Sequence, residues 1–278
     1  MRALKKIYLF FAIGIVSCGQ VISQEYSQEE IRIKTDSILE EGNLLYKLEK
    51  AAWLITDLAL DNPSIRLDFG GYISYIKGDT TVAIILSKSD SDICIFEINF
   101  FQTNFKKPIK ELYEKREISD FEKKLITARE KIIDEIIDKK IEVIIPDGYN
   151  LNFVIFPIEE GYKLYIMTGT SQENIIPLGN DYIFIVGNDY KIQHWRKFHS
   201  RLIPQKTVGP QGEIVTGLTH SHLKSEPFIS TTDICIFMLY GSYYGLNNFA
   251  VYSSALSVYF IYKFDENTIT ISKNMDFD

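Results

Sequence analysis

The stretch THSHLKSEPFISTTD, residues 219–233 of a 278-residue chain, decides how the carboxy-terminal half of the protein folds. Side chains two positions apart in a β-strand point to the same face, so a strand over residues 219–222 would direct His220 and His222 to one point. The segment from Ser230 onward has the pattern of a helix start, with Asp233 in its first turn. We therefore expect two imidazoles and a carboxylate to meet, and these are ligands that zinc prefers.

The elements on either side of this stretch are predicted to be mostly short strands. They cover residues 141–145, 152–158, 163–168, 182–186, 191–198 and 214–219, and turn residues separate several of them. After the metal-ligand pattern we expect a helix over 231–246, a strand over 249–253 and a final hairpin over 258–271. Gly179-Asn180-Asp181-Tyr182 is nearly repeated at 187–190. Turn chemistry explains this repeat with fewer assumptions than calcium binding does.

The run HSHLKSEPFISTTD resembles the metal-binding motif of the JAMM (MPN) metalloprotease family, H-x-H-P followed by six residues and S-x-x-D. The two histidines, the serine and the aspartate are in register. Leu223 stands where the family has proline. The resemblance covers the last third of the chain, and outside the motif it rests on the order of the elements.

Specific roles follow from this resemblance. It implies zinc held by His220, His222 and Asp233, with a water in the fourth position whose pKa falls to roughly 7 on the metal. It also implies that Ser230 helps to hold the oxyanion and that an upstream glutamate accepts the proton. Glu160 is the nominee for that glutamate, although residues 152–158 before it read as a strand where the family has a helix. Glu173 is a weaker candidate for the same role.

Plainer interpretations of the same residues stay open. Ser230 and Asp233 also form a capping pair, which satisfies the free N–H groups of a helix start without any metal. His194 and His199 lie in a predicted strand, where they are ordinary sheet residues or supporting contacts of the site.

The amino terminus predicts export. Basic residues precede the apolar run over 7–16, as in a secretory signal, which we place at residues 1–23. Residues 15–18 resemble a lipobox, so Cys18 is a candidate for lipidation, which would anchor the protein to a membrane surface. Cleavage before Gln24 would instead release a periplasmic or secreted protein.

Composition limits the classes of function. The formal net charge is -7, from 37 acidic and 30 basic residues without a concentrated basic stripe, so we expect no nucleic-acid partner. Beyond Cys18 the chain has only Cys94 and Cys235, which do not make a disulfide framework, and the sequence leaves their pairing open.

The amino-terminal half is predicted to start with a helix over 27–60, followed by an antiparallel meander of strands over 65–77, 80–87 and 93–100. A second helix is expected over 109–140, broken near 118–120, where Ser119 and Glu122 form a capping box. We therefore predict an α+β fold: amino-terminal helices and a small meander in residues 24–140, then a mixed β-sheet with a late helix in 141–278.

These observations favour an exported zinc-binding protein with a JAMM-like domain, active as a zinc-dependent amide or isopeptide hydrolase if the site is complete. The alternative is a non-catalytic cell-envelope lipoprotein or interaction protein with a degenerate site. A peptide or protein ligand fits either hypothesis.

Overall fold

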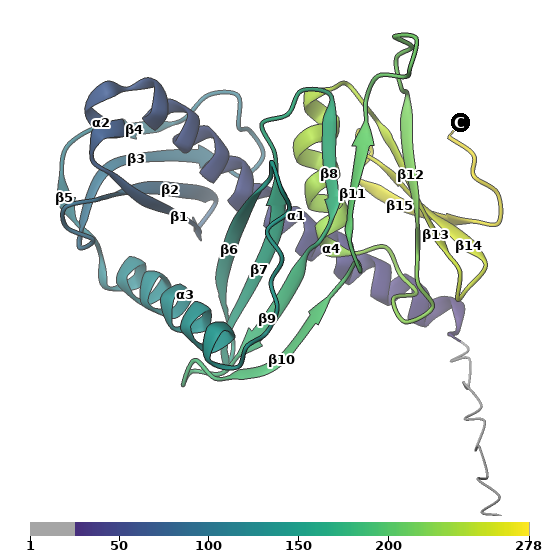
Figure 1. The fold of residues 1–278 in the computed structure, drawn as a ribbon, viewed down its shortest axis with the longest axis horizontal. Coiled ribbons are helices and arrows are strands. Elements are labelled where there is room, and N and C mark those ends of the chain that lie inside the picture. Colours follow the sequence, from purple (N-terminus) through teal and green to yellow (C-terminus); the bar gives the residue numbers. More distant parts are fainter. Residues whose placement is uncertain (1–25, 278) are drawn as a thin grey trace, which may run out of the picture.

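The structure is a computed structural model that describes residues 26–277. The predicted signal segment, with Cys18, lies outside the described residues. Within residues 26–277, no helix is both long enough and apolar enough to cross a membrane. The described part has the predicted α+β fold, in which one long helix lies against several sheets (Figure 1).

The helix α1 (Gln28–Asp61) crosses most of the molecule (Figure 1). Ser27 caps its start in a capping box with Glu30. The part of α1 from Ile31 to Leu48 packs into the core of the carboxy-terminal sheets, where Leu45 and Leu48 are fully buried. Its second half packs on the amino-terminal sheet through Ile55 and its neighbours. The two predicted parts of the chain therefore share α1.

The amino-terminal sheet contains the predicted meander of β1 (Phe69–Lys77), β2 (Thr80–Ser87) and β3 (Ile93–Phe101), all antiparallel. The expected strand over 65–77 is wrong at its start. Its first residues belong to the short helix α2 (Pro63–Leu67), because Asn62 caps that helix and proline suits its first position. Gly78, with φ of +61°, turns the chain between β1 and β2.

The second predicted helix is correct only in its latter part. The helix α3 (Asp120–Asp138) starts at the predicted Ser119–Glu122 capping box. Residues before it form β4 (Lys110–Leu112) and β5 (Arg116–Glu117), which pair with β3. Arg116 bonds two buried carboxylates there, Glu97 at 2.6 Å and Glu122 at 2.7 Å. This ion cluster holds α3 against the sheet.

A second antiparallel sheet has the strand order β10-β9-β7-β6. Its strands are β6 (Asn150–Ile158), β7 (Gly161–Gly169), β9 (Tyr182–Val186) and β10 (Ile192–Lys197). Residues 141–145, expected to be a strand, form no regular element. Glu41 of α1 bonds Lys163 at 2.7 Å and Tyr165 at 2.6 Å, so the helix is fixed to β7.

Besides β4 and β5, two more strands were not predicted, β8 (Ile175–Gly179) and β11 (Leu202–Lys206), which pair with each other. Each contains a proline, and Pro177 lies opposite Pro204. Proline cannot donate a ladder hydrogen bond and argues against a strand in a sequence pattern. A two-stranded pairing tolerates it because the missing donor can face away from the partner strand.

The last sheet is mixed, as predicted. β12 (Gly217–His222) is an edge strand parallel to β13 (Asn248–Ser253), and β14 (Val258–Lys263) and β15 (Thr268–Ser272) continue it antiparallel. The connection from β12 to β13 contains α4 (Thr231–Ile236) and the π-helical turn η1 (Phe237–Gly241), where one helix over 231–246 was expected. At Gly42 of α1 a Cβ would lie 2.7 Å from the Ile234 Cβ, so glycine permits α1 and α4 to pack closely. Cys94 and Cys235 are both buried and unpaired.

Candidate metal centre

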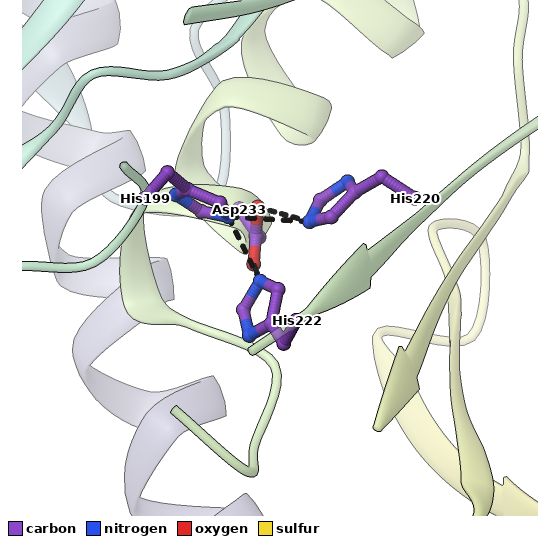
Figure 2. A group of neighbouring side chains, drawn as sticks. All are labelled: His199, His220, His222 and Asp233. Atoms are coloured by element: carbon purple, nitrogen blue, oxygen red, sulfur yellow. Dashed lines mark hydrogen bonds and ion pairs between the residues drawn. The ribbon is translucent and has the colours of Figure 1, made fainter. Parts of the chain in front are cut away.

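Four side chains meet at the end of β12: His199, His220, His222 and Asp233 (Figure 2). One ligand atom from each lies within 4.8 Å of all the others. None of these four side chains is more than 4 % exposed. The structure therefore brings together the three predicted metal ligands and adds His199 as a fourth.

The distances between these atoms fit one tetrahedral zinc ion. The Nε2 atom of His199 lies 3.2 Å from that of His220 and 2.8 Å from that of His222. The Asp233 oxygens lie 3.5, 3.4 and 3.1 Å from the Nε2 atoms of the three imidazoles, in the order His199, His220, His222. Zinc–ligand bonds of 2.0–2.1 Å in a tetrahedron separate neighbouring ligand atoms by about 3.3 Å.

The strand β12 presents its two histidines as the sequence predicted. Leu218 and His222 are buried and His220 is nearly so, whereas Thr219 and Ser221 between them are exposed. The His220 ring packs on Phe249 of the neighbouring strand, with 5.3 Å between ring centres. The period of two therefore places both imidazoles on the inner face.

A turn before β9 positions His199. The Phe198 N–H donates to the Asp181 carbonyl at 3.1 Å, and the Asn180 N–H donates to the Arg201 carbonyl at 3.1 Å. Gly179 has φ of +80°, and a side chain there would collide with that Arg201 carbonyl. The Gly-Asn-Asp turn thus holds the segment after β10, and with it His199, over the end of β12.

Hydrogen bonds of two imidazoles fix where their protons lie. His222 Nδ1 lies 2.6 Å from the Phe228 carbonyl, which only accepts, so this nitrogen carries the proton. His199 Nδ1 lies 2.7 Å from the Asp181 carboxylate, which also accepts a hydrogen bond from the Thr232 hydroxyl. In the neutral rings both Nε2 lone pairs then face each other. Two facing lone pairs repel unless a cation or a shared proton lies between them. Histidines that bind a metal usually donate their other ring N–H to a carboxylate or a backbone carbonyl, as His199 and His222 do here.

The helix start at Ser230 orients the aspartate. Ser230 Oγ accepts from the Asp233 N–H at 3.0 Å, and Asp233 Oδ2 accepts from the Ser230 N–H at 2.9 Å, so the capping box is present. Asp233 Oδ1 is buried and accepts no hydrogen bond from residues 26–277. Capping and metal ligation are therefore compatible, because the cap uses Oδ2, which also faces His222, and leaves Oδ1 directed at His199 and His220.

Strong electrostatic coupling links the four groups. Burial would lower the pKa of His199, but the carboxylates of Asp181 and Asp233 outweigh it and raise the pKa to about 9. Burial lowers the pKa of His220 to about 4. Burial would raise the pKa of Asp233, yet the three imidazoles hold it far below its usual range. Asp233 is therefore an anion in the folded protein, which a bound cation would stabilise further.

A cavity of about 310 Å³ lies against the cluster from the solvent side. The rings of His199, His220 and His222 form part of its wall, together with Ser200 and Arg201. The centre is therefore buried but lies next to a space that small molecules can enter.

Comparisons of the chain with models of protein families, with curated proteins and with solved structures found no match. The geometry of the cluster is therefore the basis for its assignment as a candidate metal centre.

The structure does not bring the other nominated residues to the centre. Glu160 lies in the exposed turn before β7, whereas Asp181 lies beside the far end of that strand, since Tyr182 pairs with Ile166. Six strand residues separate Glu160 from the position of Ile166, which corresponds to about 20 Å. Glu173 is exposed in the loop after β7. Of the candidates for catalysis, only Ser230 lies beside the cluster.

Two residues of the site had weaker sequence signals. His199 was expected to be a sheet residue or a supporting contact, and it instead offers Nε2 directly to the cluster. His194, with which it was grouped, is exposed on β10 and lies outside the cluster. Asp181 was attributed to turn chemistry, which is correct for its backbone but misses the bond of its side chain to His199. The sequence carries no signal that identifies either residue as part of the site, because nothing in the local pattern links residues 181 and 199 to the H-x-H.

Proposed function

We propose that this protein binds one zinc ion through His199, His220, His222 and Asp233, and that the ion stabilises the fold by joining three separate segments. The observation that carries the proposal is the fourth ligand. Three imidazoles and a carboxylate complete a tetrahedral zinc site, and closed four-ligand sites are typical of structural zinc. The bound ion would supply positive charge for Asp233 and for the facing lone pairs of the imidazoles.

Each residue has a separate task in this proposal. His220 and His222 would hold the metal to β12, Asp233 would hold it to α4, and His199 would hold it to the segment after β10. Asp181 acts through His199, because its carboxylate fixes the ring orientation and keeps the proton on Nδ1. Imidazole and carboxylate ligands also suit other divalent transition metals, so the identity of the ion is part of the test.

The test is the metal content of the purified mature chain, from residue 24 onward. We expect about one zinc per chain, with loss in the double variant His220→Ala/His222→Ala and in His199→Ala. The matched control is His194→Ala, which removes an exposed histidine five residues from His199. Unchanged zinc content in both cluster variants would refute the site.

A second candidate function is the metal-dependent hydrolase implied by the JAMM resemblance. The cavity of about 310 Å³ beside the three imidazoles favours it, because a substrate needs such access. Under this hypothesis His199 would occupy the fourth coordination position, which water occupies in the family, and it would have to leave that position before catalysis. Cobalt substitution separates the two functions. A four-coordinate spectrum that azide does not change supports the structural role, whereas a spectrum that shifts on adding azide supports an exchangeable position and catalysis.

For location, we propose an exported protein that is either anchored through a lipidated Cys18 or released by cleavage before Gln24. The support is the sequence pattern of residues 1–23 alone. Metabolic labelling with a fatty acid in a bacterial host, comparing the wild type with Cys18→Ala, tests the anchor. Loss of label and of membrane association in the variant is the expected result.

A further inference from the structure

A polar cavity that is open to solvent on one side lies between α1, the start of β6 and the end of β7. It is a cavity of about 280 Å³, enough space for a molecule the size of about nine waters. Residues of one face of α1 form a large part of its wall, at helical spacing: Glu49, Trp53, Thr56 and Leu60. Tyr72, Asn152 and Tyr240 also line the cavity.

Glu49 is the unusual group of this cavity. Its side chain lines the cavity although the residue is only 4 % exposed. The Oε2 atom is buried and has no hydrogen-bond partner within residues 26–277. Asn152 supplies a side-chain hydrogen bond to the carboxylate, and no cationic side chain of the described residues contributes to the pKa of Glu49. Isolated buried carboxylates are costly, so a native protein that keeps one has a use for it.

A second orphan polar atom lies in the same wall. The Oγ1 of Thr56 is buried without a hydrogen-bond partner in the described part of the chain. Thr56 is seven positions after Glu49, which places it two turns further along the same helix face. Seven residues correspond to about 10 Å along the helix axis, so the Thr56 hydroxyl lies further along the same wall than the Glu49 carboxylate.

The remaining walls suit a cation with an apolar body. Trp53 and Tyr240 lie with ring centres 5.1 Å apart, and aromatic faces attract cations. The Trp53 ring already has one cation–π contact, because Lys50 Nζ lies 5.1 Å from its ring centre. Lys50 itself lines a different cavity. Asp57 at the exposed side of the cavity adds negative charge, which the nearby Lys50 partly offsets. Among residues 26–277, neither a lysine nor an arginine lines the cavity.

A π-helical turn shapes one end of the cavity. Leu239 and Tyr240 belong to η1, and π-helical turns occur frequently at functional sites. The Tyr240 hydroxyl accepts from the Thr170 N–H at 3.0 Å, so it fixes the loop after β7 that forms the opposite wall. Burial raises the pKa of Tyr240 to about 12, and the nearby Glu49 charge adds to the rise.

We propose that this cavity binds an organic primary ammonium ion, with its N–H groups on the Glu49 carboxylate and its alkyl chain against Trp53 and Tyr240. The positive charge and the N–H donors both match the carboxylate oxygen that lacks a hydrogen-bond partner. A quaternary ammonium ion has the charge without the donors, and an alcohol has a donor without the charge. This proposal does not depend on the metal centre.

The experiment titrates the mature protein with n-butylammonium at pH 8, followed by the fluorescence of Trp53. A Trp195→Phe background leaves Trp53 as the single tryptophan. We expect a saturable change for n-butylammonium, a binding constant at least tenfold weaker for tetramethylammonium, and no saturable change for 1-butanol. Calorimetry of the same solutions detects binding that leaves the emission unchanged.

Variants assign the binding to the cavity. Glu49→Gln keeps the side-chain size and is expected to weaken binding of n-butylammonium at least tenfold. Glu40→Gln makes the same exchange at an exposed position of the same helix and should change nothing. Wild-type binding that Glu49→Gln does not weaken, equal binding of 1-butanol, or absence of calorimetric binding at millimolar ligand would overturn the proposal.

Discussion

Replacing Glu49 with glutamine should remove a pH dependence of stability that the wild type has. Burial raises the pKa of Glu49 from 4.5 to about 7, and the hydrogen bond from Asn152 opposes this rise. Between these values the folded protein holds a proton that the unfolded chain has released. Because the native state binds more protons there, the free energy of unfolding falls as the pH rises through the window. The contribution is fully present only below about pH 4.5, and it is lost above about pH 7.

The size of this effect follows from the two pKa values. Each pH unit across the window changes the free energy of unfolding by about 1.4 kcal/mol, so the whole window corresponds to roughly 3 kcal/mol. Between pH 5.5 and pH 8 the expected loss is about 2 kcal/mol. Glu49 is almost completely buried, so solvent screening reduces this value little. The glutamine variant should lack the loss and be the more stable protein at pH 8.

Urea unfolding at a series of pH values, with zinc in excess and no amine present, measures the effect. Every other titrating group is common to both proteins, so the difference between wild type and Glu49→Gln isolates this carboxyl group. Glu40→Gln should follow the wild-type curve. A constant difference between wild type and Glu49→Gln across the pH range would refute the reasoning that burial without a charge partner raises this pKa.

Two further substitutions test the contacts that support the metal centre and the amino-terminal sheet. Asp181→Asn should weaken zinc binding about 10- to 100-fold, because His199 loses the carboxylate that orients it. A competing chromophoric chelator measures the affinity, Asp189→Asn in the duplicate turn is the control, and equal affinities of the two variants would argue against the role of Asp181. Arg116→Met should lower the free energy of unfolding by about 3 kcal/mol, since two buried carboxylates lose their partner. Arg32→Met, which breaks an exposed pair, should change stability by less than about 1 kcal/mol, and similar losses in both variants would contradict the account.

The amino-acid pattern predicted several elements well because their reasons are local. The boundaries of β2 and β9 are those expected, since continuous apolar runs end at Gly, Asn and Asp turn residues. The capping box at Ser119 marked the true start of α3 for the same reason. In contrast, the charged segment before it reads as helix and forms β4 and β5, because the partner strand β3 and the Arg116 ion cluster lie elsewhere in the chain.

The candidate site divides in the same way. The i, i+2 spacing of His220 and His222 and the helix start at Ser230 are local features, so the sequence predicted that they and Asp233 would converge. The turn at Gly179 places Asp181 at the cluster, and the segment after β10 places His199 there. The H-x-H pattern does not predict either contact. The distance of Glu160 from the cluster could not be predicted from the sequence either, because it depends on which end of β7 lies near β12.

The sequence by itself therefore determined the α+β class, the repeating turns, the capped helices and a three-residue metal-ligand pattern. All of these depend on residues a few positions apart. Tertiary structure alone decided that His199 joins the cluster, that α1 packs into both cores, and that Glu49 is buried without a cationic partner among residues 26–277. These features depend on the packing of segments far apart in the chain. The physical reason is that helix and strand periodicity place a side chain on a face, whereas only the packed fold decides what that face meets.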